Sequence, residues 1–397
     1  MVGYGFIFGD GSSNGFAAST HLFTDKDNHY GWLFSNWFFQ FSFCATATTI
    51  VSGCLAERTR LPAYVAFSLV NTVIYAIPAH WVWHKDGWLR REGVVDFAGC
   101  GPVHMVGGMT GWMGSVMIGP RREKGAPSSL VNAVFGLFML WWGWLGFNCG
   151  STLGITGEKW LYASKAAVTT VLSTVGGGVA TFAYCHWQYS GVYPVEDIVN
   201  GILGALVSIT GCCVYVKTSE SLCIGAVGAM VTLRSNMALR GWVDDPVGAV
   251  GVHFFGAVWG MVAGGLWVQP INSLNVEPGA FYGGHLIGAQ CIAIVSISLW
   301  ACLSSIVAFF IIDNAIGMRL SPEEEERGAD AVYHLIPAMP VDNDTVHELV
   351  EESEQAASEQ EQQGEQEKQK EEDVRRVVAA AAAPQAPLPP GCVVAVD

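Results

Sequence analysis

Two stretches of this chain repeat one pattern: "DFAGCGPVHMVGGMTG", from Asp96 to Gly111, and "DPVGAVGVHFFGAVWG", from Asp245 to Gly260. Both read D-x2-G-x3-V-H-x2-G-x3-G, and they are offset by 245 − 96 = 149 residues. In each copy an aspartate opens an apolar run, and a histidine follows eight residues later. Because ionisable groups are costly in apolar surroundings, a pattern that occurs twice predicts a task for both residues.

The composition of the chain indicates which surroundings these stretches have. Of its 397 residues, 51% are apolar and only 14% are charged. A helix needs about 20 apolar residues to cross roughly 30 Å of hydrocarbon, and long charge-free runs recur along the chain. We therefore expect an all-α, polytopic membrane protein with about nine spans, near residues 31–56, 61–84, 96–119, 129–150, 160–186, 196–217, 221–240, 244–268 and 282–312.

The charge of the chain is unevenly distributed. Residues 1–312 hold 15 acidic and 14 basic residues, whereas residues 313–397 hold 20 and 6, so the second part contributes 6 − 20 = −14 of the net −15. We predict a transmembrane domain at 1–312, a short following segment at 313–340, and an acidic, largely disordered tail at 341–397. Lys and Arg are slightly more numerous on the tail's side of the membrane, which favours a cytoplasmic C-terminus.

Neither composition nor motifs indicate an enzyme or a metalloprotein. Most of the eleven cysteines lie inside apolar runs, where they act as small hydrophobic residues, and no C-x-x-C or zinc-like spacing occurs. We expect no cofactor, no metal and no nucleic-acid partner. An intramembrane metallohydrolase using Asp96, His104 and His253 lacks an H-E-x-x-H motif and a third clustered ligand.

The spacing within the motif places the histidines at mid-membrane. Eight residues extend about 12 Å along a helix, and half of the hydrocarbon is roughly 15 Å thick. The span that Asp96 opens is the third and the span that Asp245 opens is the eighth, so the two helices run in opposite directions. His104 and His253 then reach one depth from opposite sides and can meet, as in an inverted repeat.

The repeat also leads to an expectation about the start of the chain. The second copy is the fifth span of its half, whereas the first copy is only the third span available. If the halves match, about two spans are missing from the N-terminus.

Other polar residues have plainer interpretations. An aspartate at the start of a membrane helix is well suited to cap it, because its carboxylate accepts free backbone N–H groups; this interpretation applies to Asp96 and Asp245. His80, His186 and His285 lie near span ends, where we expect them at the membrane interface.

Several motifs resemble the ammonium transporter family, in the Amt/Mep branch of the superfamily that includes Rhesus-type channels. The resemblance covers most of residues 1–335. It rests on "FQFSFCATATTIVSGCLAER" (39–58), "PAHWVW" (78–83), "DFAGCGPVHMVGGMTGWMGSVMIGPR" (96–121), "WWGWLGFNCGS" (141–151) and "DDPVGAVGVH" (244–253). Trp112 departs from the family, which usually has a smaller apolar residue there. The resemblance implies an inverted-repeat fold of eleven spans, of which the first and most of the second are absent here.

The resemblance also implies roles for individual residues. Trp83 and Ser151 would recruit ammonium at the outer mouth, since an indole face attracts a cation and a serine hydroxyl accepts an N–H bond. Phe39 would lie beside the vestibule, and Asp96 would support the recruitment region by fixing backbone carbonyls. Without the resemblance, Trp83 would be interpreted as an interfacial belt residue.

Deeper in the pore the resemblance implies a gate and a relay. Phe43 and Phe147 would be stacked rings that close the pore, although core packing is the ordinary interpretation of such rings. Ammonium would lose its proton near this gate, because an apolar lumen disfavours the charged form. Ammonia would then pass the neutral pair His104 and His253.

The family further implies a homotrimer in the plasma membrane, with lipid around it and a pore in each subunit. "GMRLSPEEEERGADAVYH" (317–334) resembles the family's cytoplasmic regulatory segment, so a cytoplasmic regulator at the C-terminal tail is a candidate partner. Plant members carry a phosphorylatable threonine two residues after the aspartate at the Asp330 position, where this chain has Val332, so that switch does not transfer.

Three alternatives remain open at this stage. A Rhesus-type ammonia/CO2 gas channel is disfavoured by Trp83, which such proteins lack. An ammonium sensor would keep the pore as a receptor coupled to the tail. A chain without its first spans could also be a non-functional fragment.

Overall fold

The computed structural model describes residues 2–9, 13–18, 30–122, 124, 129–271, 276–336 and 370. Within these residues the regular elements are helices. In addition, Thr59 and Arg319 form one isolated antiparallel bridge. This confirms the predicted all-α class. The chain divides into two compact units, Met1–Ala329 and Asp330–Asp397.

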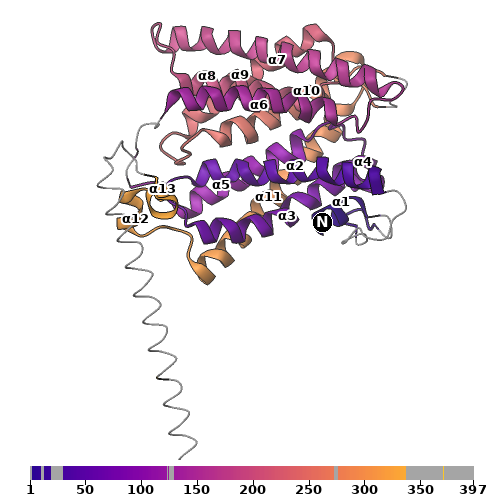
Figure 1. The fold of residues 1–397 in the computed structure, drawn as a ribbon. Coiled ribbons are helices and arrows are strands. Elements are labelled where there is room, and N and C mark those ends of the chain that lie inside the picture. The colour runs from indigo at the N-terminus through magenta and orange to yellow at the C-terminus, as the bar shows by residue number, and fades with distance from the viewer. Residues whose placement is uncertain are drawn as a thin grey trace, which may run out of the picture. The chain divides into compact units, whose positions relative to one another are not determined.

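The first unit contains most of the helices in the described part of the chain (Figure 1). In chain order they are α1 (Val2–Phe8), α2 (Tyr30–Leu55), α3 (Leu61–Trp83), α4 (Trp88–Arg91), η1 (Cys100–Met105), α5 (Val106–Ile118), α6 (Leu130–Gly150), α7 (Lys159–Gln188), α8 (Val195–Thr210), α9 (Thr218–Leu239), η2 (Val250–Phe255), α10 (Gly256–Trp267), η3 (Ala280–Tyr282), α11 (Leu286–Ile316) and α12 (Pro322–Arg327).

These helices form two groups that meet at the repeated motifs. Helices α2, α3 and α5 pack together with α11, and helices α6 to α9 form the other group with α10 (Figure 1). The segments η1 and η2 contact each other between the groups, and each also contacts helices of the opposite group. The two motifs are therefore brought together although 149 residues separate their histidines.

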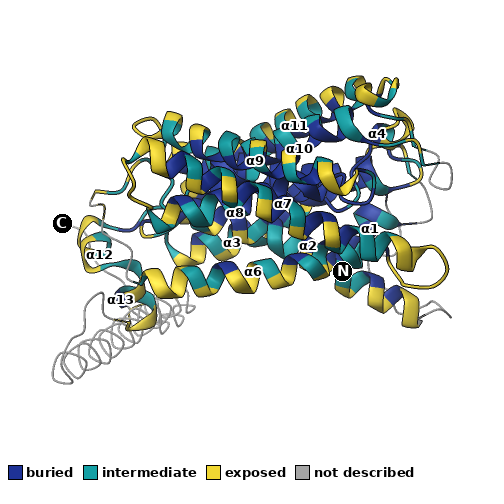
Figure 2. Ribbon diagram, turned by 90° about the horizontal axis from the view of Figure 1, so that it is seen from above, coloured by how far each residue is buried: buried dark blue, intermediate teal, exposed yellow. Residues whose placement is uncertain are grey.

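Seven helical segments in the described part of the chain are long and apolar enough to cross a membrane, one of them formed by η2 and α10 together. Two other predicted spans, 96–119 and 196–217, are not among these seven: the first contains η1 followed by α5, and in the second α8 ends at Thr210 before a series of turns. Figure 2 shows exposed residues along the outward face of α6 and buried residues between α8, α9 and α10. Large apolar side chains on the outward faces are exposed, as expected where lipid replaces water; the chain is an integral membrane protein.

Glycines in the motifs determine how closely the two groups approach. Gly99 and Gly248, three residues after each aspartate, have φ angles of +93° and +72°, which L side chains rarely adopt. Gly108 allows the crossing itself, because a Cβ there would lie 2.4 Å from the backbone nitrogen of Phe254. The motif therefore specifies two turns and a backbone contact.

The second unit is described from Asp330 to Ile336 and at Lys370. Helix α13 (Ala329–His334) begins at the last residue of the first unit, and the N–H of Ile336 donates to the carbonyl of Asp330 at 3.1 Å. Apart from Lys370, the tail predicted at 341–397 lies outside the described residues.

Candidate functional site

The Asp96 carboxylate is the acceptor that starts the first motif's helix. It accepts the N–H groups of Gly99 at 2.8 Å, Cys100 at 2.9 Å and Gly101 at 2.7 Å. Sequence reasoning had Asp96 fixing backbone carbonyls; a carboxylate has only acceptor atoms, and here it binds N–H groups. The Asp96 backbone carbonyl has its own partner, the indole N–H of Trp83 at 2.9 Å.

Asp245 occupies the corresponding position in the second motif. Its carboxylate accepts the N–H of Val250 at 2.7 Å and a longer bond from Val247 at 3.4 Å. The geometry at both aspartates is that of a helix cap, which was one of the two interpretations of their position.

Each cap is followed by a π-helix that carries the histidine. His104 lies in η1 and His253 in η2. A π-helix widens the backbone by one residue per turn and is frequently found at functional sites. The sequence pattern predicted helix in these regions but not the π-helical geometry, because hydrophobic periodicity over six residues does not distinguish the two.

The structure brings the two histidines together. Their Nδ1 atoms are 3.1 Å apart, and the rings are nearly parallel, with centroids 5.2 Å apart and an interplanar angle of 12°. The Nε2 atom of His104 is buried and has no hydrogen-bond partner among the described residues. The pair thus uses its Nδ1 atoms on itself and leaves His104 Nε2 available.

This contact restricts the protons on the two rings. A hydrogen bond between two Nδ1 atoms requires that one carries hydrogen and the other presents its lone pair. In neutral rings, the donor then has an acceptor at Nε2 and its partner has an N–H there. Two fully protonated rings would direct N–H groups at each other, so the contact fits at most one positive charge.

Aromatic rings connect the histidines to Trp83. The rings of Phe43 and Phe147 are stacked with centroids 4.0 Å apart and an interplanar angle of 15°. Trp83 meets Phe43 edge-on at 5.7 Å, and Phe147 lies 5.7 Å from His104. Five rings therefore form a continuous row, from Trp83 through the phenylalanines to the two histidines.

Phe39 and Ser151 lie beside this row. Phe39 is 4.8 Å from Phe43, and a Cβ on Gly150 would lie 2.6 Å from its ring. The Ser151 hydroxyl donates to the carbonyl of Phe147 at 2.8 Å, which leaves its oxygen lone pairs able to accept a bond. Ser151 is half-buried at the end of α6.

The sequence reasoning missed a residue that supports His104. The Trp144 indole is stacked on the His104 ring, with centroids 5.0 Å apart and an angle of 8°. Its N–H donates to the Thr210 hydroxyl at 2.9 Å, which holds the indole in position. The available signal was spacing, since Trp144 precedes Phe147 by one helical turn and therefore shares its face of α6.

An ionic network lies next to Asp245. Arg121 donates to the Asp244 carboxylate through its backbone N–H, Nε and Nη2 at 2.8 to 3.1 Å, and it also pairs with Glu57. Although burial alone would raise the pKa of Asp244, the hydrogen bonds from Arg121 hold this pKa well below its usual value. The fully buried Arg58 donates to the Asp244 carbonyl at 2.7 Å.

The same network reaches the segment after α11. Arg319 donates to the carbonyls of Ile118 at 3.1 Å and Pro120 at 2.8 Å, and it forms an ion pair with Glu325. The loop between α5 and α6 is thereby connected to residues 319–325 within the first unit.

The remaining histidines differ in their surroundings. His80, predicted at the interface because it lies near the end of its span, is fully buried in α3, with Nδ1 2.7 Å from the carbonyl of Ile7 and Nε2 2.9 Å from the Ser13 hydroxyl. Tertiary contacts with the N-terminal residues enclose it. His186 and His285 are exposed, as predicted for interfacial residues.

Comparison with known proteins shows which sequences this chain resembles. A sequence profile described as the Ammonium Transporter Family matches residues 1–338. "Putative ammonium transporter 3" of Caenorhabditis elegans is 36% identical over 84% of this chain, and the chain spans 52% of that relative's length. "Ammonium transporter 3" of Dictyostelium discoideum is 34% identical over 84% of this chain and 80% of the relative.

Solved structures show a similar arrangement of helices. A structure titled "Sensor Amt Protein" has a TM-score of 0.75 and 29% identity over 84% of this chain and 85% of its own. Mep2 of Candida albicans has a TM-score of 0.72 and 26% identity over 81% of this chain and 75% of its own.

Proposed function

The chain belongs to the Ammonium Transporter Family, and we propose that it moves ammonium across a membrane. The family consists of transport proteins rather than enzymes. The observation that carries the proposal is the Nδ1 contact between His104 and His253 at the end of the row of rings that starts at Trp83.

The proposal starts with recruitment at Trp83 and Ser151. Attraction between a small cation and an indole face contributes about 1–2 kcal/mol when the site is partly desolvated. The Ser151 hydroxyl, already oriented by the Phe147 carbonyl, supplies an acceptor for an N–H of ammonium. Together they replace part of the water that ammonium loses, and Asp96 contributes indirectly through its carbonyl bond to Trp83.

The next steps are closure, deprotonation and passage. The stacked Phe43 and Phe147 separate the mouth from the histidines and have to move to admit a molecule. An apolar lumen disfavours charge, so ammonium leaves its proton near this gate and continues as ammonia. The Nε2 atom of His104, which has no partner among the described residues, offers ammonia a hydrogen-bonding site, and the shared Nδ1 proton offers a relay.

The proposal extends to assembly and location. The family resemblance supports a homotrimer in the plasma membrane with a cytoplasmic C-terminus and a regulatory segment at 313–340. The contacts of Arg319 with the loop between α5 and α6 support that role, because they would let a cytoplasmic regulator acting on the tail affect this loop.

Transport by the purified full chain in proteoliposomes tests the proposal. We expect radiolabelled methylammonium uptake by the unaltered chain, and uptake lower by about 100-fold in His104→Ala and His253→Ala, since proton transfer by a positioned side chain typically contributes this much. His285→Ala is the control, because this exposed histidine lies outside the row of rings. Membrane current recorded in parallel separates transport of net charge from passage of neutral ammonia.

One result would contradict the proposed transport, and another would contradict the proposed relay. Absence of uptake by a correctly folded, unaltered chain would favour the sensor alternative over transport. Unchanged uptake in both histidine variants would exclude the relay while leaving transport intact.

A further inference from the structure

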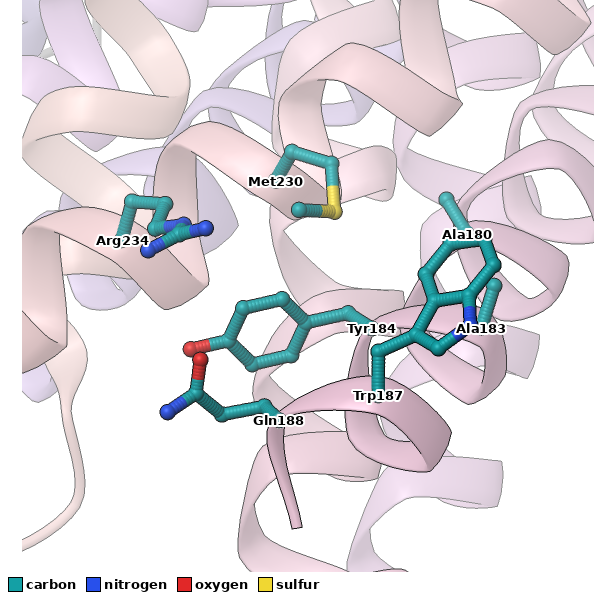
Figure 3. A pocket seen from close by; sticks show the side chains of 7 residues that line it. All are labelled: Ala180, Ala183, Tyr184, Trp187, Gln188, Met230 and Arg234. Atoms are coloured by element: carbon teal, nitrogen blue, oxygen red, sulfur yellow. The ribbon is translucent and has the colours of Figure 1, made fainter. Parts of the chain in front are cut away.

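Two glutamines near the ends of membrane helices have different surroundings. Gln188, the last residue of α7, is exposed. It borders a hollow of about 380 Å³ between α7 and α9, which is also lined by Ala180, Ala183, Tyr184, Trp187, Met230 and Arg234 (Figure 3). Gln290, the fifth residue of α11, is only 1% exposed. Burying an amide among apolar helices is unfavourable unless it is hydrogen-bonded, so Gln290 requires partners.

The partners of Gln290 are backbone groups, and two of them belong to Val95, directly before the first motif. The Oε1 atom of Gln290 accepts the N–H of Val95 at 3.0 Å. Its Nε2 atom donates to the carbonyl of Val95 at 2.9 Å and to the carbonyl of Met261 at 3.3 Å. Gly264 leaves room for this amide, because a Cβ there would lie 3.1 Å from Nε2. Gln290 therefore binds both polar backbone groups of Val95, as a neighbouring β-strand would.

Val95 lies in a segment that needs such partners. Residues 94–99 are outside the helices, so their backbone groups cannot be satisfied within a helix. In this segment the carbonyl of Asp96 accepts the indole N–H of Trp83 at 2.9 Å. Each residue has two soft backbone dihedrals, so the direction of this carbonyl depends on how the preceding peptide is held. Gln290 holds that peptide through Val95.

The second motif has a comparable contact made by a charged side chain. The residue before its capping aspartate is Asp244, and the Asp244 carbonyl accepts Nη2 of Arg58 at 2.7 Å. A guanidinium in place of Gln290 would repel a cation bound at Trp83, whereas a neutral amide binds the backbone without adding charge. The uncharged side chain is therefore compatible with a site that recruits a cation.

We propose that Gln290 is a positioning residue for ammonium recruitment. By binding both backbone groups of Val95 it holds the Asp96 carbonyl, and this carbonyl orients the indole of Trp83 through its N–H. Gln290 itself does not contact ammonium. The inference rests on the proposed function, because it takes Trp83 as the residue at which ammonium binds.

Uptake kinetics of the full chain in proteoliposomes test this role. Gln290→Met keeps an unbranched side chain of similar size but removes the hydrogen bonds. We expect it to raise KM for methylammonium by about tenfold, an effect of the size of a lost buried hydrogen bond. The maximal rate should change less than about twofold, because the histidine pair is unaltered. Gln188→Met is the matched control at the exposed glutamine, and should leave KM and the maximal rate unchanged.

Combination with Trp83→Leu separates positioning from a general loss of stability. Trp83→Leu alone should raise KM. In this background Gln290→Met should raise KM by less than about twofold further, because the residue through which it acts is already absent. If Gln290→Met raised KM by the same factor in both backgrounds, Gln290 would act independently of Trp83 and the proposal would be wrong.

Gln290→Glu provides a second measurement in case Gln290→Met does not fold. A protonated carboxyl has a donor and an acceptor, as the amide has, and it can bind both backbone groups of Val95. KM of Gln290→Glu at about pH 5.5 should therefore lie close to that of the unaltered chain. A KM raised about tenfold at this pH would contradict the role of these hydrogen bonds.

Hydrogen exchange at the backbone amides of residues 94–97 distinguishes this inference from the proposed function. We expect faster exchange in Gln290→Met than in the unaltered chain, because the contact with Val95 is lost. Unchanged exchange and unchanged KM would show that Gln290 does not hold Val95. Faster exchange together with no uptake by the unaltered chain, or with an unchanged KM in Trp83→Leu, would instead show that the proposed recruitment is wrong although the contact holds the segment.

Discussion

At the first motif the Asp96 carboxylate accepts three backbone N–H groups within 2.9 Å, whereas at the second motif the Asp245 carboxylate accepts one at 2.7 Å and one at 3.4 Å. Both caps start a π-helix, and both are followed by a glycine with positive φ. The backbone task of the motif is therefore the same in its two copies.

The surroundings of the two caps differ. Trp83 lies against the carbonyl of Asp96 and begins the row of aromatic rings. Next to Asp245, Asp244 instead belongs to an ionic network with Arg121 and Arg58. The repeat thus provides the same backbone arrangement at both motifs. Residues outside the repeat place a row of aromatic rings beside the first motif and an ionic network beside the second.

The largest expected effect comes from disrupting the backbone contact between the two motifs. Gly108→Leu would place a side chain where a Cβ already lies 2.4 Å from the Phe254 backbone, and backbone cannot yield as a flexible side chain can. We expect a loss of stability of about 3 kcal/mol or more, measured by detergent unfolding and size-exclusion chromatography.

Gly143→Leu on α6 is the matched control, because nothing lies within 4 Å of a Cβ at that position. A folded Gly108→Leu variant as stable as the control would show that the crossing of the two motifs is looser than described.

A smaller effect should distinguish the two caps. Asp96→Asn leaves one acceptor for three N–H groups, whereas Asp245→Asn loses less because its second bond is long. We expect a lower free energy of unfolding by about 3 kcal/mol for Asp96→Asn and about 1 kcal/mol for Asp245→Asn. Equal losses in parallel titrations would mean that the longer bond does not weaken the second cap.

The smallest effect concerns the ionic network around Asp244 and appears only at low pH. A carboxyl with a depressed folded-state pKa stabilises the fold above its unfolded pKa of about 3.9, and this contribution is lost as pH falls towards the folded pKa. Because the pKa of Asp244 is lowered, the unaltered chain should lose thermal stability below about pH 4.

Asp244→Asn removes the titrating group, so the melting temperature of this variant should be lower at pH 6 and should fall less between pH 6 and pH 3. Glu196→Gln is the control, since the Glu196 side chain is exposed and forms no ion pair with the other described residues. Identical acid dependence in the Asp244→Asn variant and the unaltered chain would assign the acid sensitivity to other groups.

Much of the helical organisation was predictable because membrane spans have a strong local signal. Charge-free runs predicted the helices, and the repeat at offset 149 predicted that His104 and His253 meet, since helix geometry relates spacing to depth. The all-helical class follows from the same requirement, because every backbone polar group in hydrocarbon needs a partner.

Other features depend on contacts between residues far apart in the chain. The sequence pattern did not distinguish π-helix from α-helix at the histidines, and it did not indicate that Trp144 is stacked on His104 or that His80 is enclosed by the N-terminal residues. Packing sets ring stacking and burial of this kind, and neither composition nor periodicity contains that information.

Local chemistry along the chain thus specified which segments are helices, where each aspartate caps and how far along its helix each histidine lies, because these depend on distances of a few residues. The approach of the two motifs produced the rest: which atoms of the histidines face each other and which rings continue the row to Trp83. These features arise when helices separated by more than a hundred residues pack against each other, and they require the positions of atoms in three dimensions.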